Sequence, residues 1–247
     1  MLTAQYQTGE YLEKVPDWHA ADAPWKARQI LRLLERNRVA PESVCDVGCG
    51  AGEILVQLQP RLRGEPRLTG YDISGQAIAL CQPKENARLR FHRGDFLQGR
   101  EGYDLLLLLD VLEHVPDYLG FLAALRPRAR RFVFHVPLDW SVQAVAEGSR
   151  YPLSMRERYG HLHFFTAETA LRAIRDAGYR VEDAFHTWDH DLEQGFPPVQ
   201  PGLRARLKYP LRCLRYGLER LAFQSRPALT ARLRPHYNLL VLASAEG

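Results

Sequence analysis

Glycine occurs at every second position of a short turn, at Gly48, Gly50 and Gly52. Glycine adopts backbone torsions that other residues resist, and it lets a ligand approach the main chain closely. The apolar segment 44–47 precedes the turn, and the helical pattern 54–58 follows it. A strand, a glycine turn and a helix N-terminus in this order form a nucleotide-type pocket at the carboxyl edge of a parallel sheet. This turn is therefore the first candidate binding site.

The spacing of the glycines separates two families of nucleotide-type sites. The dinucleotide fingerprint, G-x-G-x-x-G, needs a glycine where this chain has Glu53. The pattern G-x-G-x-G instead resembles motif I of the class I methyltransferases, which use S-adenosylmethionine (SAM) and release S-adenosylhomocysteine. The resemblance implies that backbone amides at Gly48, Gly50 and Gly52 approach the methionine part of SAM. It also implies that Asp46 accepts a hydrogen bond from the SAM ammonium group.

The next two predicted strands end in groups that suit the rest of such a methyl donor. Asp72 ends the strand 67–72 and is followed by Ile73. An acid at the carboxyl end of a second strand can accept both ribose hydroxyls. Asp95 and Phe96 follow the third strand, where Asp95 could accept from the adenine amino group and Phe96 could lie against the ring. We assign these residues to donor binding.

The fourth predicted strand, 103–109, leads directly into Asp110, Val111 and, three residues later, His114. This stretch resembles the motif IV region of the same family, which adds these three residues to the expected SAM-binding set. Matching segments after four consecutive strands, in the expected order, are a stronger signal than one glycine turn. The competing interpretation is purely structural: the glycines tighten a turn, and the aspartates cap helices.

The resemblance covers roughly residues 40–190 and the last strand. It is closest to bacterial methyltransferases that include the ubiquinone-biosynthesis O-methyltransferases and many glycan-cluster enzymes. The stretch 159–166, with the sequence YGHLHFFT, matches their G-H-x-x-F-F-T pattern. Thr166 is also suited to cap the helix that follows it, because its hydroxyl can accept from a backbone amide of the first turn.

Methyl transfer to oxygen requires a base as well as a donor. The sulfonium methyl is already electrophilic, so the protein mainly has to position the nucleophile. A hydroxyl must also lose its proton, which histidine can accept near neutral pH. Among nine histidines we rank His161 and His114 as the general-base candidates, ahead of His135 and His163. In the alternative, His161 fixes its loop and His114 lines the SAM pocket without transferring a proton.

Two acidic and histidine-rich patterns could in principle bind a metal. In ubiquinone-pathway relatives an E-x-x-E-H stretch resembles a divalent-ion site, and here the corresponding residues are Asp110, Glu113 and His114. The spacing of His186 and His190 would suit a metal on a helix, but this segment is predicted as a strand end and a loop. We therefore expect no metal cofactor at either place.

Strands and helices alternate along most of the chain, which is typical of a doubly wound α/β sheet. Five consecutive leucines, 105–109, indicate a central parallel strand that is buried on both faces. The last two strands resemble the antiparallel closing pair of the class I methyltransferases. We predict a mostly parallel, seven-stranded Rossmann-like sheet with an antiparallel last strand and a helical cap. The expected strands are 43–47, 67–72, 88–92, 103–109, 131–136, 179–188 and 238–243.

We divide the chain into four regions. The first, 1–40, is a cap segment with the first helix, and 41–190 is the SAM-binding core. The third, 191–236, is a basic helical insert over the substrate, and 237–247 is the final core strand. The first and third regions would form a lid over the sheet edge, from which Lys26 or Arg28 could reach the SAM carboxylate.

The segment 203–234 is strongly basic. It contains nine Lys or Arg residues and one acid, whereas the rest of the chain has 24 basic and 28 acidic residues. Its leucines at 207, 211, 214, 218 and 221 share one helix face. Three interpretations remain: the leucines pack on the sheet domain and the arginines are merely solvated, the arginines bind substrate phosphate, or the segment makes peripheral contact with anionic lipid.

Composition sets the broad class. An apolar content of 46% and a charged content of 25% are ordinary for a soluble globular protein. The first residues lack a signal-peptide core, and the longest apolar run is too short to cross a bilayer. The four cysteines form no C-x-x-C pair and are expected to be reduced thiols. We expect a cytoplasmic protein, with membrane contact limited to the periphery.

These observations lead to a SAM-dependent methyltransferase that acts on a small-molecule or glycan acceptor, at oxygen. The acceptor could carry phosphate or lipid. Nucleic acid is not the expected substrate, because aromatic residues do not interleave the basic segment and the rest of the chain is acidic. The alternatives are an NAD(P)-dependent Rossmann-fold oxidoreductase and a non-catalytic SAM-binding module. The sequence does not determine the oligomeric state.

Overall fold

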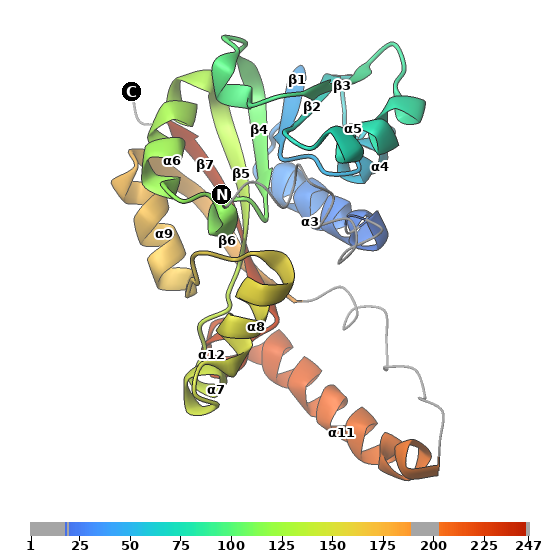
Figure 1. Cartoon of the computed structure of the whole chain (residues 1–247), viewed down its shortest axis with the longest axis vertical. Coiled ribbons are helices and arrows are strands. Elements are labelled where there is room, and N and C mark those ends of the chain that lie inside the picture. Colours follow the sequence, from blue (N-terminus) through green and yellow to red (C-terminus); the bar gives the residue numbers. More distant parts are fainter. Residues whose placement is uncertain (1–17, 19, 189–202, 246–247) are drawn as a thin grey trace.

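The protein is built around one sheet of seven strands in the order β3-β2-β1-β4-β5-β7-β6. The computed structural model describes residue 18, residues 20–188 and residues 203–245, with only the backbone of 203–207 (Figure 1). The strands are β1 Ser43–Val47, β2 Arg67–Asp72, β3 Leu89–Arg93, β4 Tyr103–Leu109, β5 Ala129–Pro137, β6 Tyr179–Trp188 and β7 Tyr237–Ala245. β7 is antiparallel to both β5 and β6, and the other pairings are parallel. The predicted fold is confirmed.

The leucines of β4 show how the sequence specifies the layers. Leu106 and Leu108 belong to one apolar cluster, whereas Leu105 and Leu107 belong to another. Successive side chains of a strand point to opposite faces, so an uninterrupted leucine run requires an apolar layer on each side. The sheet is therefore covered on both faces.

Helices supply these two layers. One face is covered by α3 Ala23–Arg36, α4 Glu53–Leu58 and α5 Gly75–Cys81, and the other by α6 Tyr118–Leu125 and α9 Ala167–Asp176 (Figure 1). Thr166 caps α9 as expected, because its hydroxyl accepts from the amide of Thr169 at 3.2 Å. Layers on both faces of the sheet leave the carboxyl ends of the parallel strands as the open edge.

Two short helices, α7 Val142–Ala146 and α8 Arg150–Tyr159, were not expected from the sequence. Pro152 is the one buried residue that α8 contributes, so no apolar period marks this helix. Gly148 and Ser149 separate the two helices with positive φ angles of 68° and 62°. A helix that is mostly exposed leaves little hydrophobic pattern to detect.

Between β6 and β7 lie α11 Leu203–Ser225 and α12 Pro227–Leu233. α11 packs on the body through Tyr216 and Phe223, whose rings contact Trp188 edge-on at 6.0 and 5.1 Å between centroids. The leucines lie elsewhere: four of them are exposed, by 69%, 60%, 58% and 61% for Leu211, Leu214, Leu218 and Leu221. The interpretation that these leucines pack on the sheet domain is wrong, because aromatic side chains form that contact.

Within the described residues, no helix is both long enough and apolar enough to cross a membrane.

Trp188 should anchor the insert. Its side chain is 4% exposed and contacts Tyr216, Phe223 and Tyr237. We expect Trp188→Ala to lower the free energy of unfolding by about 3–5 kcal/mol, because it leaves a cavity where four aromatic rings meet. The exposed Trp140 is the matched control, and Trp140→Ala should cost less than about 1 kcal/mol. Denaturant titration followed by circular dichroism measures both values, and equal losses would contradict this role of Trp188.

Candidate functional site

A cavity of about 750 Å³ opens at the carboxyl ends of β1, β2, β4 and β5. Of the residues that the sequence offered for donor binding or catalysis, only Gly52, Arg28 and the lower-ranked His163 lie outside its lining. The carboxyl ends of parallel strands meet at one edge, and the chain reverses its strand order there between β1 and β4. The four segments that follow β1, β2, β3 and β4 are thus brought together in one cavity. The assigned residues in the lining are Asp46, Gly48, Gly50, Asp72, Ile73, Asp95, Phe96, Asp110, Val111, His114 and His161.

The glycine turn has the backbone that its sequence predicts. Gly48, Gly50 and Gly52 have φ angles of +79°, +54° and +77°. Gly52 lies outside the cavity lining, and a Cβ there would lie 2.5 Å from the ring of Phe91. A Cβ at Gly70, on the neighbouring strand, would lie 2.6 Å from the same ring. Gly52 is thus required for the turn and for packing.

Asp72 ties this turn to β2. One carboxylate oxygen accepts from the amide of Gly50 at 2.9 Å and the other from the amide of Ser74 at 2.8 Å. Burial raises the pKa of Asp72, and the two amides oppose that shift. A carboxylate has about four acceptor positions, so two backbone contacts leave capacity for ligand hydroxyls. Asp72 therefore holds the glycine turn and also lines the cavity, whereas the helix that follows is capped by Ser74.

Asp46 is a buried carboxylate of the cavity, with one oxygen unpaired in the part of the chain that the structure describes. Its side chain is 2% exposed, and Oδ1 has no hydrogen-bond partner among the described residues. Burial, followed by the negative charges of Asp72 and Asp110, raises the pKa of Asp46 to about 7. An unpaired buried carboxylate is stabilised by a cationic ligand, since the ligand supplies the missing partner.

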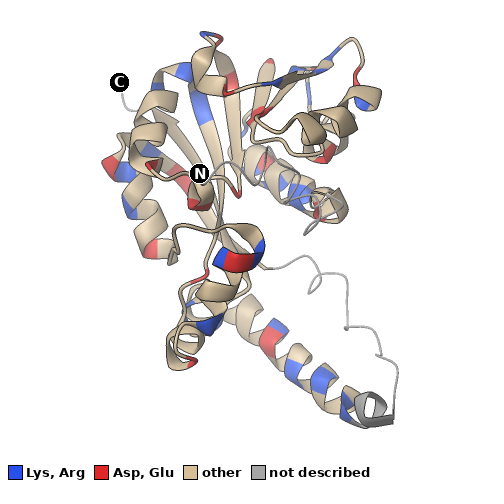
Figure 2. Cartoon of the chain, viewed as in Figure 1, with Lys and Arg blue, Asp and Glu red and all other residues tan. Residues whose placement is uncertain are grey.

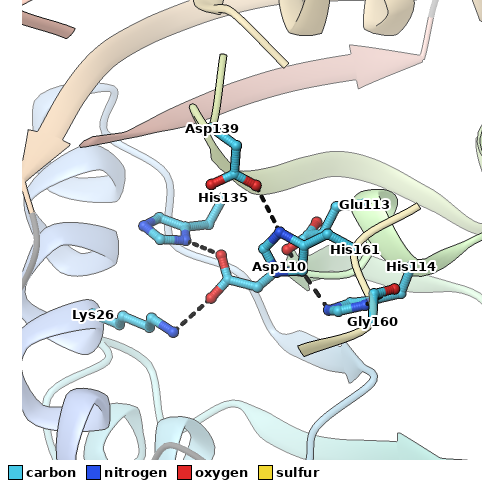
Figure 3. A network of polar contacts seen from close by, with 8 residues as sticks. All are labelled: Lys26, Asp110, Glu113, His114, His135, Asp139, Gly160 and His161. Atoms are coloured by element: carbon cyan, nitrogen blue, oxygen red, sulfur yellow. Dashed lines mark hydrogen bonds and ion pairs between the residues drawn. The ribbon is translucent and has the colours of Figure 1, made fainter. Parts of the chain in front are cut away.

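Asp110 joins the first helix to the fifth strand (Figure 3). It accepts from Lys26 Nζ at 2.6 Å and pairs with His135 Nδ1 at 2.5 Å. Burial acts against the charged form, but His135 and Lys26 together hold the pKa of Asp110 well below its usual range. Lys26 therefore reaches the cavity as expected, and its partner is Asp110. The backbone of Asp110 has a φ of +55°, a conformation that these contacts keep in place.

A second polar pair lies across the cavity. His161 Nδ1 is 2.6 Å from Asp139 Oδ2, and both side chains are buried (Figure 3). Among the described residues nothing hydrogen-bonds Nε2 of His161, which leaves that nitrogen available to a substrate. The ring of His114 lies 5.0 Å from that of His161, edge to face, and its Nδ1 is 3.3 Å from the carbonyl of Gly160. The two base candidates are thus neighbours, and Asp139 distinguishes them.

Glu113 lies beneath these histidines. It is fully buried, and neither carboxylate oxygen has a hydrogen-bond partner among the described residues. Burial and the charge of Asp110 raise its pKa well above the usual range. Ligand atoms of Glu113, His114 and His161 lie within 4.8 Å of one another, so these three could hold a divalent ion. The sequence had placed Asp110 in such a set, but Asp110 is occupied by Lys26 and His135. The expectation of no metal stays a prediction.

Asp95 and Phe96 line the cavity, and both also make contacts within the protein. Asp95 caps the next turn by accepting from the amide of Leu97 at 2.9 Å. Phe96 is 3% exposed, and the guanidinium of Arg128 lies 4.4 Å from the centre of its ring. The placement of adenine beside these two residues stays a prediction.

Two further described histidines, His163 and His186, are not part of the cavity lining. His163 Nε2 lies 3.0 Å from the carbonyl of Val115, which fixes the loop between α8 and α9. Burial lowers the pKa of His186, whose Nε2 has no hydrogen-bond partner among the described residues. His190 lies outside the described residues, so the second metal pattern is not tested.

One wall of the cavity was missed from the sequence. The helix α8 contributes Tyr151, Met155, Arg158 and Tyr159. Asp139 was missed as well, because a single acid after a strand gives no signal of its histidine partner 22 residues later. Asp139 follows a strand that ends at the cavity, and His161 lies on a later loop that the sequence also places there. This arrangement could have suggested the Asp139–His161 pair.

The geometry agrees with comparisons to known proteins. A family model described as a methyltransferase domain matches residues 10–184. The chain belongs to the methyltransferase-domain family. This confirms the resemblance on which the predicted fold and donor site rest.

Individual relatives of this methyltransferase-domain chain are distant. A ubiquinone biosynthesis O-methyltransferase from Rhodopseudomonas palustris is 28% identical over 159 residues, 60% of this chain and 62% of that protein. A trans-aconitate 2-methyltransferase from Deinococcus radiodurans is 33% identical over 106 residues, 43% of this chain and 39% of that protein. The chain therefore spans less than two thirds of these relatives.

A solved structure shows the same fold. The magnesium protoporphyrin IX methyltransferase from Synechocystis with bound S-adenosylhomocysteine superimposes with a TM-score of 0.56 at 16% identity, over 90% of this chain and 83% of that one.

The raised pKa of Asp46 gives a test without ligand. The pKa of Asp46 is about 7 in the folded state and 3.8 in the unfolded chain, so the folded state binds the proton more tightly. Protonation therefore stabilises the fold below pH 3.8, and this stabilisation is lost as the pH rises from 3.8 to about 7. Asp46→Asn removes the titration. We expect the variant to gain about 2–3 kcal/mol relative to wild type between about pH 5 and pH 8. Denaturant melts at both pH values measure this gain. The exposed Asp176→Asn is the control, and a pH-independent difference for Asp46→Asn would contradict the raised pKa.

Proposed function

We propose that this methyltransferase-domain protein transfers the methyl group of SAM to the oxygen of a small-molecule or glycan acceptor. One observation carries the proposal: the glycine turn, the buried carboxylates of Asp46 and Asp72, and the His161–Asp139 pair all line one cavity. The glycine turn and the two carboxylates suit a cationic nucleoside donor, and the His161–Asp139 pair suits a base beside it. Because the relatives are longer than the matched region, the activity of the whole protein is part of the proposal.

The donor end of the cavity matches the charge of SAM. The unpaired oxygen of Asp46 would accept from the ammonium group, while Asp72 would accept the ribose hydroxyls beside the amide of Gly50. Carboxylates at Asp46 and Asp72 also attract a sulfonium, whose positive charge is lost only when the methyl leaves. Binding of the donor would therefore offset the burial and the repulsion that raise the pKa of Asp46.

The acceptor end supplies a base. As the acceptor oxygen attacks the methyl carbon, the carbon–sulfur bond breaks and its electron pair stays on sulfur, giving S-adenosylhomocysteine. The hydroxyl proton passes to Nε2 of His161, and Asp139 stabilises the imidazolium through Nδ1. Asp139 also fixes the ring so that Nε2 is the nitrogen that accepts. His114 lies 5.0 Å away, ring to ring, and its Nε2 is 3.9 Å from Oε1 of Glu113, whereas Nδ1 of His161 is 2.6 Å from Asp139.

A carboxylate acceptor is the second candidate, because one relative is named a trans-aconitate methyltransferase and aconitate is a carboxylate. A carboxylate needs no base at neutral pH, so His161 would then only orient the acceptor. Arg158, a basic residue that α8 contributes to the cavity lining, could neutralise such an acceptor. The two candidates differ in how much the rate depends on His161.

The donor is tested by ligand-induced stabilisation. We expect SAM and S-adenosylhomocysteine to raise Tm, because ligands that bind only the folded state stabilise it by mass action, while NADH leaves it unchanged. Asp72→Asn should weaken SAM binding by at least about tenfold, because it removes charge and one acceptor beside the ribose. The exposed Asp176→Asn is the matched control. Calorimetry measures each Kd, and stabilisation by NADH alone would replace the proposal with the oxidoreductase alternative.

The base is tested by separating turnover from donor binding. With any hydroxyl acceptor that releases S-adenosylhomocysteine, His161→Ala should lower kcat by about 10²–10⁴-fold while the Kd for SAM changes little. Asp139→Asn should lower kcat less and shift its pH profile. His163→Ala is the control on the same loop. Full activity of His161→Ala on a carboxylate acceptor would support the second candidate, and its full activity on a hydroxyl would remove His161 as the base. Donor binding without turnover on any acceptor would favour the non-catalytic alternative.

A further inference from the structure

The exposed apolar side chains of this protein gather at one end. Twelve large hydrophobic residues are exposed in the described part of the chain, and ten of them belong to the segments around α7, α8, α11 and α12. These helices contact one another in sequence, α8 to α7, α7 to α12 and α12 to α11, at the end of the molecule away from α4 and α5 (Figure 1). The ten are Trp140, Val142, Val145, Leu153, Leu211, Leu214, Leu218, Leu221, Leu229 and Leu233.

The arrangement on α11 is that of an amphipathic helix turned outward. Tyr216 is 7% exposed, and with Phe223 it holds the helix to the body. At 100° per residue, the four exposed leucines of α11 centre on the opposite side of the helix from these two rings. We call Leu211, Leu214, Leu218 and Leu221 the leucine face. Leucines at helical spacing normally pack against the protein core, but those of the leucine face are exposed. A contiguous exposed apolar surface of this kind often marks an interaction site.

Basic side chains lie on both sides of the leucine face. Lys208 and Arg215 flank it on one side, and Arg220 lies on the other side, closer to the surface that packs on the body. All three are exposed, and none forms an ion pair with a described residue. Figure 2 shows how basic residues are distributed along α11. By contrast, the one acid of the helix, Glu219, is neutralised by Arg234 at 2.6 Å. The helix therefore presents apolar surface with uncompensated positive charge on its flanks.

We propose that this end of the molecule docks on a lipid bilayer that carries anionic headgroups. The leucine face enters the interface, and Lys208, Arg215 and Arg220 meet the headgroups. Lateral insertion of this kind needs apolar residues on one face and basic residues beside it, without a membrane span. A second copy of the chain is a poorer occupant, because two leucine faces brought together would also bring together two unpaired basic flanks.

Docking would place the cavity beside the membrane. The helix α8 lines the cavity through Tyr151 and Met155, and its Leu153 is exposed with the other apolar residues of this end. This goes beyond the proposed function, because attachment to a bilayer requires neither donor nor acceptor. It also gives a reason for the insert between β6 and β7, which the sheet itself does not need.

Vesicle flotation of the full chain tests the proposal without any methyl donor. We expect binding to vesicles of equal parts phosphatidylglycerol and phosphatidylcholine, little binding to phosphatidylcholine alone, and release by salt. Replacing all four residues of the leucine face by Gln should lower the partition coefficient at least about tenfold. The control is the double variant Leu80→Gln and Leu119→Gln, which alters exposed leucines elsewhere and should bind as wild type does.

A second set of variants tests the charge. Lys208→Gln, Arg215→Gln and Arg220→Gln together should lower binding to anionic vesicles at least about tenfold. The triple variant of the exposed Arg61, Arg63 and Arg100 to Gln removes equal charge from the other end and should leave binding unchanged. Unchanged SAM affinity in each variant shows that the fold is intact.

Three results would overturn the proposal: no flotation at low salt, equal flotation of the leucine-face variant, or binding that ignores headgroup charge. A dimer in light scattering that the leucine-face variant abolishes, without flotation, would assign the face to a second copy. Loss of methyl transfer leaves flotation unaffected, so failure of the proposed function is distinguishable.

Discussion

Negative charge held out of water at one sheet edge is the constraint around which the cavity is organised. Asp46, Asp72, Asp110 and Glu113 all end up there because the strands that precede them run parallel and stop together. Lys26 and His135 pair directly with Asp110. The pKa values of the other three are raised, with burial as the largest cause. Such an arrangement favours a ligand that brings positive charge.

The fold and the donor end of the cavity could be predicted because their signals are local. The leucine run of β4 requires two apolar layers, and glycines in alternation require a turn with positive φ. Both properties depend only on neighbours in the sequence, so they survive without knowledge of the tertiary structure. The same holds for Thr166, whose hydroxyl caps the helix that begins one residue later.

Features that depend on distant partners could not be predicted in this way. Asp139 can orient a histidine only because the folded chain brings His161, 22 residues later, within hydrogen-bond distance of it. The leucines of α11 have the spacing of a core face, but two aromatic residues on the other side of the helix determine which face is buried. Spacing reports that a helix has two different faces, and it does not report which one meets the protein.

The ring of Phe91 has a further consequence for how this sequence can change over evolution. It fills the space in which a side chain at Gly52 or Gly70 would otherwise fit. Gly70 has an ordinary strand backbone, but a Cβ there would also lie 2.8 Å from Sγ of Cys49. A side chain at position 70 therefore needs a smaller residue at position 91 together with a shift or replacement of Cys49, and these three positions are expected to vary together among homologous chains. Gly52 would gain the same room but would still be held by its φ of +77°. A drifting lineage can therefore exchange one of these glycines for another residue and must retain the other.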